Sequence, residues 1–157
     1  MIRTIQNAED YEYIVNSHWR IYSREYHFDD SFRNFIIQSV NHFMENCNVK
    51  REQIWILEVD GQRRGSIGIV DSGADVAQLR WLLIEPECRG NGHGRELLHK
   101  AIQHAINCKY HKVILWTNSA LLAARNLYEE FGFKICELRK EILSNQEITE
   151  ERWELEL

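Results

Sequence analysis

The first residues that could do chemistry form a short run in the middle of the chain, Arg89-Gly90-Asn91-Gly92-His93-Gly94. Apolar residues follow it at helical spacing, so the run is expected to open a helix. Backbone N–H groups are unpaired at a helix N-terminus, and the helix dipole adds partial positive charge there. Such a site suits a phosphate or a pyrophosphate. The glycines remove Cβ atoms that would keep an anion from the backbone, and Arg89 can add a charge-assisted contact.

A buried strand is expected immediately before this loop. Residues 78–84 are mostly apolar and short enough for a strand, and Pro86, the only proline of the chain, would end it. After the loop, one helix face carries an apolar stripe of Leu97, Leu98, Ala101, Ile102, Ala105 and Ile106. A tight strand-to-helix turn without a ligand would show the same local pattern, so the loop alone leaves that alternative open.

The composition is that of one ordinary globular domain. Of the 157 residues, 44% are apolar and 27% are charged, which is typical of a chain with a single core. A net charge of −5 without a basic block argues against nucleic-acid binding. Because no apolar run approaches about 18 residues and no signal pattern is visible, we expect no membrane partner and a cytoplasmic location. The four cysteines lack metal-site spacing and are interpreted as reduced thiols.

The whole chain, residues 1–157, is predicted to form one mixed α/β domain. Strands are expected at 1–5, 54–59, 64–70, 76–84, 113–116, 133–138 and 153–157, and helices at 8–25, 30–45, from the glycine-rich loop to 107, and from 119 to about 131. The strands between 54 and 84 form an antiparallel meander. The strand at 113–116 should run parallel to its predecessor because a helix separates them. Ser119 is the expected N-cap of the last helix, and residues 144–150 form a polar loop.

The connection between the first two helices, residues 22–30, is dense in aromatic and ionisable side chains. A loop of this composition either lines a pocket or is a solvated connector whose aromatic rings pack onto the sheet. The pattern does not choose between these two interpretations, and both stay open at this point.

Three features together make the chain resemble the GNAT-type N-acetyltransferase superfamily. The loop Arg89-x-x-Gly92-x-Gly94 follows a long strand, Leu127-Tyr128-x-x-Phe131-Gly132-Phe133 ends the last helix, and residues 76–135 have the order strand–helix–strand–helix. A narrower similarity, to the acetyltransferase half of MarR–GNAT fusion proteins, is carried by Tyr22-Ser-Arg-Glu-Tyr26, Arg80-Trp81-Leu82-Leu83 and Leu115-Trp116-Thr117-Asn118-Ser119. The 157 residues contain no winged-helix regulator sequence.

The resemblance implies a GNAT-like α/β (α+β) fold with a mixed, mostly antiparallel sheet flanked by about four helices. In that fold strands 76–85 and 113–117 splay apart, and the pantetheine arm of acetyl-CoA enters the gap. Main-chain groups of the first strand would bind the arm, one N–H would polarise the thioester carbonyl, and the glycine-rich loop would hold the pyrophosphate. The coenzyme contacts implied in this way are Leu82, Leu83, Ile84, Arg89, Gly90, Asn91, Gly92, His93, Gly94, Arg95 and Asn118.

Acetyl transfer from a thioester to an amine needs the amine to lose a proton and the leaving thiolate to gain one. A free alkylamine, with a pKa near ~10, is almost wholly charged at neutral pH. Desolvation and a base or a water chain must therefore free its lone pair. The resemblance assigns protonation of the thiolate to Tyr128. Its place on the apolar stripe with Ala124 and Phe131 also fits an ordinary core tyrosine.

The general base is left open by the sequence. Some family members carry a glutamate on the strand before the loop, but the matching position here is near Gln78, which cannot take a proton. Glu85, or an ionisable residue of the segment 22–30 acting through water, could replace it. From that segment Glu25 and His27 are the candidates chosen for catalysis.

The sequence therefore predicts an acetyl-CoA-dependent N-acetyltransferase that moves the acetyl group directly to a primary amine of a small molecule, an amino acid or a peptide. A monomer or homodimer is expected. No metal site is expected, because His104 and Cys108 share a helix face but have no further ligands beside them. Two alternatives remain: a transferase for another acyl-CoA, and a catalytically silent acyl-CoA-binding or regulatory module. An NAD-type dinucleotide site is disfavoured, because its loop should follow an N-terminal strand.

Overall fold

Seven strands and four α-helices make up the computed structural model, which describes all residues from 1 to 157. The strands form one sheet in the order β1-β2-β3-β4-β5-β7-β6. They are β1 (Ile2–Thr4), β2 (Gln53–Val59), β3 (Gln62–Asp71), β4 (Val76–Ile84), β5 (Lys112–Asn118), β6 (Lys134–Leu143) and β7 (Gln146–Glu156). The helices are α1 (Ala8–Tyr26), α2 (Asp30–Asn46), α3 (His93–Asn107) and α4 (Leu122–Glu130). None of them is both long and apolar enough to cross a bilayer.

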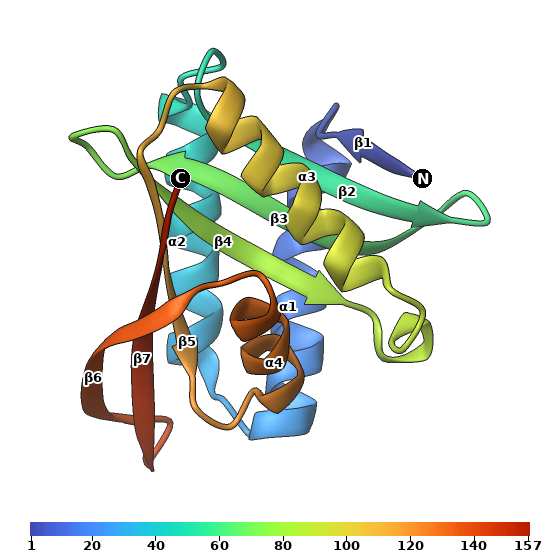
Figure 1. Cartoon of the computed structure of the whole chain (residues 1–157). Helices are drawn as coiled ribbons and strands as arrows, with labels where there is room; N and C mark the ends of the chain where they lie inside the picture. Colours follow the sequence, from blue (N-terminus) through green and yellow to red (C-terminus); the bar gives the residue numbers. More distant parts are fainter.

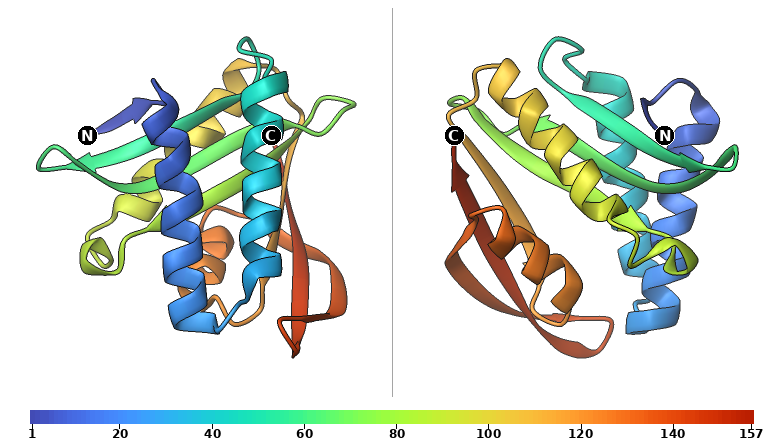
Figure 2. Two further views of the ribbon diagram at one scale, coloured as in Figure 1. Left: turned by 180° about the vertical axis from the view of Figure 1, so that it is seen from behind. Right: turned by 45° about the vertical axis from the view of Figure 1, so that its right-hand side comes forward.

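Helices cover both faces of the sheet (Figures 1 and 2). α1 and α2 pack side by side against one face, and α3 crosses the other. Each helix presents one apolar stripe, so each face of the sheet has a core of its own. The core on the α3 side includes Leu57, Ile67, Leu97, Leu98, Ala101 and Val113. The core on the α1/α2 side includes Ile14, Ile36, Val40, Phe43, Ile54 and Trp81.

The parallel neighbours β4 and β5 separate along their length. The expected parallel pairing is confirmed, yet only Val76–Gln78 pairs with Lys112–Ile114. Both strands continue beyond that point, and Figure 1 shows them diverging towards the bottom of the view, with α4 beside the gap. From Leu79 onward the edge of β4 that faces β5 has no partner strand. Such an edge can pair with an extended ligand through its main-chain N–H and C=O groups.

A bulge interrupts β4 at Trp81. This residue has a φ of 56°, a left-handed conformation that bulky side chains rarely adopt, and the β3–β4 register shifts between Ser66 and Gly68. Ser66 Oγ donates a 2.6 Å hydrogen bond to the Trp81 carbonyl. A Cβ on Gly68 would lie 2.6 Å from the indole ring, so glycine is required there. The bulge places the consecutive residues Arg80 and Trp81 on the α1/α2 side, whereas a regular strand would alternate them.

Two predicted boundaries near the C-terminal half are wrong. The last helix begins at Leu122 without a side-chain cap, not after Ser119. Asn118 Oδ1 accepts a 2.9 Å hydrogen bond from the Ala120 N–H, which turns the chain before the helix can start. The predicted polar loop at 144–150 is a tight turn at Ser144 and Asn145, both with positive φ. β6 and β7 therefore form one long hairpin that carries residues 146–150 into the sheet.

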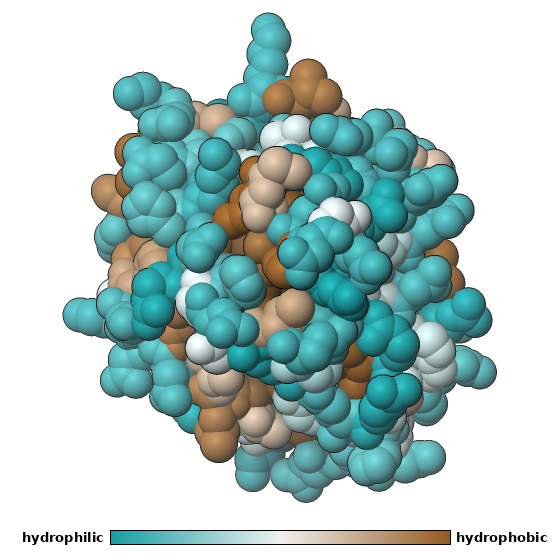
Figure 3. Space-filling view, turned by 90° about the vertical axis from the view of Figure 1, so that its right-hand side faces the viewer, coloured by the Kyte–Doolittle hydropathy of each residue, from teal (hydrophilic) through white to brown (hydrophobic).

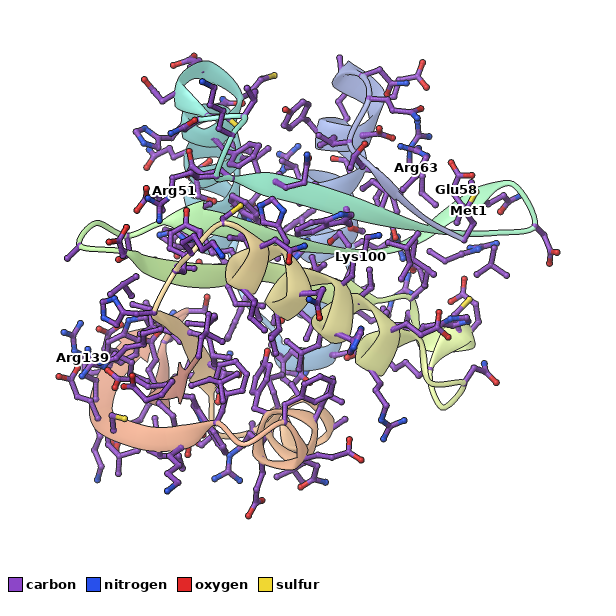
Figure 4. All side chains as sticks on the ribbon, turned by 45° about the horizontal axis from the view of Figure 1, so that its top comes forward. Met1, Arg51, Glu58, Arg63, Lys100 and Arg139 are labelled. Carbon is purple, nitrogen blue, oxygen red and sulfur yellow. The ribbon has the colours of Figure 1, made fainter.

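A buried carboxylate joins the N-terminal strand to α1 and β3. The Asp10 side chain is fully buried and accepts two 2.8 Å hydrogen bonds from Arg3 and one of 2.7 Å from Arg63 Nε. Burial alone would raise the pKa of Asp10, but the two arginines outweigh it and hold that pKa well below its usual range. Figure 4 shows Met1, Glu58 and Arg63 together at this end of the sheet. Arg3 Nε also donates to Glu58 there, at 2.6 Å.

Replacing Asp10 with asparagine is expected to lower the free energy of unfolding by about 3 kcal/mol, because two arginines lose their buried counter-charge. Urea unfolding at pH 7 measures this loss. The matched control is Glu9→Gln, since Glu9 meets Arg63 at 3.5 Å with a side chain that is 76% exposed. That variant should change stability by less than about 0.5 kcal/mol. Equal effects of the two substitutions would contradict the role given to Asp10.

Candidate functional site

Two adjoining cavities lie where β4 and β5 part. The first, here called the loop cavity, measures about 400 Å³ and is lined by the loop before α3, the end of β4, α1 and α4. The second, the inner cavity, measures about 510 Å³ and extends towards α2, β5 and β7. Tyr22, Leu82, Leu121 and Ala124 line both, so the cavities adjoin along the open edge of β4. Figure 3 views the side on which the loop lies and shows apolar atoms in a hollow between hydrophilic side chains.

The loop before α3 offers an open cradle of backbone. Gly90 and Gly92 both have a φ of +81°, and a Cβ on either residue would meet no atom within 4 Å. Gly92 is the N-cap of α3, and no side chain caps this helix. The first N–H groups of α3 therefore stay available at the positive end of the helix dipole. A diphosphate fits such a cradle without displacing any side chain.

Both arginines predicted at the diphosphate site are held by carboxylates. Arg89 donates to Glu25 at 2.8 and 3.2 Å, which links the loop to α1. Arg95 donates to Glu130 at 2.9 and 3.0 Å, which links α3 to α4. The two arginine side chains are 44% and 57% exposed. Ion pairs this exposed are worth little, so either guanidinium can turn to a phosphate at small cost.

Most of the other predicted coenzyme contacts line the loop cavity. They are Leu82, Leu83, Ile84, Gly90, Gly92, His93 and Gly94. Nδ1 of His93 is buried without a hydrogen-bond partner in the chain. Asn91 lines neither cavity, since its amide donates to the Cys88 carbonyl at 3.2 Å. Asn118 lies apart from the loop, in the wall of the inner cavity.

The expected connection at residues 22–30 is shorter, because α1 continues to Tyr26 and only residues 27–29 join it to α2. The last turns of α1 line both cavities. Tyr22 lines the two of them, and Glu25 and Tyr26 line the loop cavity. Tyr22, Phe28 and Phe32 pack together, with ring centroids 5.0 to 6.0 Å apart. Each of the two interpretations of residues 22–30 therefore holds for part of them. Tyr22 and Tyr26 line the cavities, whereas Phe28 packs against other aromatic rings.

Tyr128 on α4 lies in the wall of the inner cavity. Its side chain is 5% exposed and packs against Phe133 and Trp153, with ring centroids at 5.7 and 6.0 Å. Burial raises the pKa of Tyr128 above its usual value, and the nearby Tyr22 raises it further. Tyr128 is thus a core tyrosine that also borders a cavity. Its phenol stays protonated at neutral pH and can act as a proton donor.

The carboxylates and the histidine considered as bases have different surroundings. Glu85 is buried and accepts from Arg20 at 2.6 and 3.0 Å. Burial favours a higher pKa for Glu85, but Arg20 outweighs it and holds that pKa below its usual value. Glu85 lines neither cavity. Glu25 borders the loop cavity in its pair with Arg89, and His27 is an exposed residue at the end of α1.

A carboxylate that the sequence did not single out lies in the wall of the inner cavity. Glu150 on β7 is half-buried and stands opposite Asn118 in the β5–β7 pairing. Burial raises the pKa of Glu150 and Glu141 raises it further, while Arg139, labelled on β6 in Figure 4, opposes them. Glu150 fell within the predicted polar loop. Only the extension of the β6–β7 hairpin brings it to the cavity, and no local pattern signals that.

His18 is a buried neutral side chain in the wall of the inner cavity. Its Nδ1–H donates a 2.7 Å hydrogen bond to the Ile14 carbonyl, and its ring stacks on Tyr22 at 6.0 Å. Burial lowers the pKa of His18 to about 4. The neutral ring leaves Nε2 as a hydrogen-bond acceptor for a ligand.

Acid should weaken the fold through His18. An unfolded histidine has a pKa near ~6.5, so between pH 6.5 and about 4 the unfolded chain binds a proton that the folded chain excludes. The free energy of unfolding should therefore decrease as the pH is lowered through this window, by up to about 3 kcal/mol. Urea unfolding of the wild type and of His18→Gln at pH 7 and 4.5 checks this, because the difference between the two proteins isolates the contribution of His18. Parallel loss of stability in the two proteins would contradict the expectation.

No group of three or more histidine, cysteine, aspartate or glutamate side chains comes close enough to hold a metal ion. His104 and Cys108, which share a face of α3, contact each other at 3.5 Å. Nε2 of His104 also lies 3.0 Å from the Arg51 carbonyl, so this pair serves the packing between α3 and the chain before β2.

A family model described as the Acetyltransferase (GNAT) family matches residues 11–133. The chain belongs to this family. The match runs from α1 to Phe133, and so includes the glycine-rich loop, the parted strands and Tyr128. The GNAT fold and the acetyltransferase class expected from the sequence are thereby confirmed.

Relatives of known sequence and structure agree with this assignment. An uncharacterised N-acetyltransferase of Schizosaccharomyces pombe is 25% identical over 137 residues, which are 87% of this chain and 82% of that protein. The N-acetylaspartate synthetase of Xenopus tropicalis is 30% identical over 81 residues, 51% of this chain but only 30% of the synthetase. A Salmonella typhimurium protein solved with its cofactor acetyl-CoA shares the fold, with a TM-score of 0.77 at 16% identity, covering 100% of this chain and 93% of that one.

Acetyl-CoA, which the Salmonella typhimurium structure contains, fits the residues that line the loop cavity of this chain. The uncapped start of α3 and the open space over Gly90 and Gly92 suit the diphosphate. The unpaired edge of β4 suits an extended arm with amide groups.

Proposed function

We propose that this acetyltransferase moves the acetyl group directly from acetyl-CoA to a primary amine, with no acetylated protein residue on the way. One observation carries the proposal: the loop cavity and the inner cavity adjoin at the open edge of β4, around Leu82. A donor anchored at the glycine-rich loop and an acceptor bound in the inner cavity would meet there. The acceptor belongs to a small molecule, an amino acid or a peptide.

The reaction uses main-chain groups and one phenol of this chain. Acetyl-CoA supplies an activated thioester when bound. A fixed N–H in the segment Leu82–Ile84 would stabilise negative charge that develops on the carbonyl oxygen during transfer. Tyr128, which burial keeps protonated, would donate its proton to the departing sulfur.

The amine must reach the reaction without its extra proton. Glu150 borders the inner cavity, has no ion-pair partner there, and has a raised pKa, which suits a base at neutral pH. We assign it the proton of the acceptor amine, taken directly or through water. Glu25 and His27, chosen from the sequence, stay predictions. Glu25 lies beside the loop in its ion pair with Arg89, whereas His27, at the exposed end of α1, lines neither cavity.

Glu150→Gln is expected to lower kcat/KM about tenfold at pH 7, because the amine then loses its proton only to water. The deficit should shrink as the pH approaches ~10, where the free amine itself becomes abundant. The matched variant is Glu25→Gln, which should alter the KM for acetyl-CoA and leave the shape of the pH profile unchanged. Profiles of kcat/KM from pH 6 to 10 measure both. If the pH profile of kcat/KM changed in Glu25→Gln and stayed as in the wild type in Glu150→Gln, the role of base would belong to Glu25 and not to Glu150.

Several finer expectations remain proposals. The similarity to the acetyltransferase half of MarR–GNAT fusions is one, and a cytoplasmic monomer or homodimer is another. The N-acetylaspartate synthetase among the relatives has, by its name, an amino-acid product. This supports an amino acid among the candidate acceptors, although the match covers only about half of this chain.

Release of free CoA from acetyl-CoA across a panel of primary amines tests the proposed function. Turnover that depends on the amine, with the acetylated amine identified by mass spectrometry, is the expected result. Rapid transfer from a longer acyl-CoA but not from acetyl-CoA would favour the transferase for another acyl group. Tight acetyl-CoA binding without turnover on any amine would favour the catalytically silent module.

A further inference from the structure

Arg80 is a positively charged side chain without a counter-ion in the wall of the inner cavity. Six other arginines of the chain are partly buried, and every one of them pairs with a carboxylate: Arg3, Arg51, Arg63, Arg64, Arg125 and Arg152. Arg80 donates one long hydrogen bond, 3.4 Å, to Gln78 Oε1. Its guanidinium lies 5.9 Å from the centre of the Trp81 ring. Neither neighbour carries a negative charge.

An unpaired guanidinium at this place does not help the fold. Burial lowers the pKa of Arg80, and no acidic group offsets that effect. An apolar side chain in the same strand would be at least as stabilising. The bulge at Trp81 keeps Arg80 and Trp81 together on the cavity side of β4. A charge held in a cavity without a partner points to a ligand that brings the opposite charge.

The position of Arg80 limits the size of that ligand. Arg80 precedes Leu82 by two residues with the bulge at Trp81 between them, so the two are separated by at most about 7 Å along the strand. Leu82 is where the two cavities adjoin. An anion on Arg80 is therefore only a few atoms away from an amine at the acetyl group. Glu150 on β7 also borders the cavity, so the cavity offers one positive and one negative group. This pattern complements a small molecule that carries both an amine and an anion.

The remaining walls of the inner cavity are mostly hydrophobic, and several of their side chains are aromatic. They include Tyr22, Phe32, Phe35 and Trp116. His18 contributes a ring that burial keeps uncharged. An acceptor with an apolar side chain would bury that side chain here, whereas a second charged group would find no partner.

Building on the proposed function, we propose that the acceptor is a free amino acid with an apolar side chain, whose carboxylate is bound by the guanidinium of Arg80. The planar guanidinium can donate two parallel hydrogen bonds to a carboxylate. The amine of the same molecule faces the open edge of β4. The N-terminus of a peptide fits less well, because an uncharged amide stands where the carboxylate would be.

The test compares L-phenylalanine with 2-phenylethylamine, which differ only in the carboxylate, and with L-phenylalaninamide. The proteins are the wild type, Arg80→Gln, Arg80→Lys and the control Arg33→Gln, since Arg33 is exposed on α2 and lines neither cavity. The wild type should prefer phenylalanine about 100-fold in kcat/KM, as a charge-assisted pair allows. Arg80→Gln should reduce the preference to about threefold or less. Arg80→Lys should keep part of the preference for phenylalanine, and Arg33→Gln should keep all of that preference.

Equal use of phenylalanine and 2-phenylethylamine by the wild type would overturn the inference, and so would a preference that Arg80→Gln retains. A phosphonate analogue of phenylalanine that is used better than phenylalanine would show that the anion is not a carboxylate. Calorimetry on the protein with CoA separates this inference from the proposed transfer. If no amine is acetylated, phenylalanine binding that Arg80→Gln weakens still supports Arg80 as the carboxylate site. Absence of such binding would overturn it.

Discussion

Gly92→Val is expected to abolish measurable binding of CoA and acetyl-CoA, a loss of at least about 100-fold in Kd. The φ of Gly92 is +81°, a conformation that is strained for any β-branched residue. A side chain at this position would also enter the open space over the loop, because no atom lies within 4 Å of the place that its Cβ would take. The valine would therefore occupy the place assigned to the diphosphate. Calorimetric titration with CoA measures the loss.

Gly73→Val is the matched control for this substitution. Gly73 lies in the turn between β3 and β4, has a φ of +88°, and also has no atom within 4 Å of a built Cβ. Both variants carry similar backbone strain, about 1–2 kcal/mol. Only the variant at Gly92 should lose CoA binding. Wild-type affinity in Gly92→Val, or an equal loss in Gly73→Val, would contradict the placement of the diphosphate.

Tyr128→Phe is expected to lower kcat by about 10²-fold or more, while the Kd for CoA changes by less than about twofold. In the proposed reaction the phenol gives its proton to the departing thiolate, so its removal should act on the chemical step and not on binding. Because burial holds the pKa of Tyr128 above its usual value, the phenol stays protonated as the pH rises. The wild-type rate should therefore show no decline from tyrosine ionisation up to about pH 10.

Tyr110→Phe separates catalysis from packing. Tyr110 is also buried, and its hydroxyl donates to the Arg51 carbonyl at 3.3 Å, but it lines neither cavity. This variant should lose about 1 kcal/mol of stability and keep the wild-type kcat. Wild-type turnover in Tyr128→Phe at every pH would remove Tyr128 from the mechanism and leave it as a core residue.

The helices, the strand direction and the loop that position the site could be predicted where they depend on residues close together in the sequence. Helical spacing of apolar residues located α1, α2 and α3 to within a residue or two. The helix between residues 84 and 113 required β4 and β5 to be parallel, and they are. The glycine-rich loop was recognised because glycines and a following apolar stripe are local features. These signals come from neighbours in the sequence, which is why they can be seen without a structure.

The inner cavity could not be predicted, because long-range pairing creates it. The bulge at Trp81 depends on Ser66 and Gly68 of the neighbouring strand, and alternation along β4 contains no sign of it. Glu150 reaches the cavity only because β6 and β7 pair along their full length. The partners of Arg89 and Arg95 come from α1 and α4, which lie far from the loop in the chain. Only the family resemblance indicates a catalytic role for Tyr128, because its spacing alone favours an ordinary core residue.

Calorimetric and thermal titration of the wild-type protein with CoA and with acetyl-CoA is the most direct test that the glycine-rich loop and the parted strands bind the donor. Saturable heat is expected, together with stabilisation by about 2.7 kcal/mol when the ligand is at 100 times its Kd. This should appear as an unfolding midpoint several degrees higher. Absence of both heat and thermal shift with either compound would contradict the assignment of this site, and with it the proposed acetyl transfer.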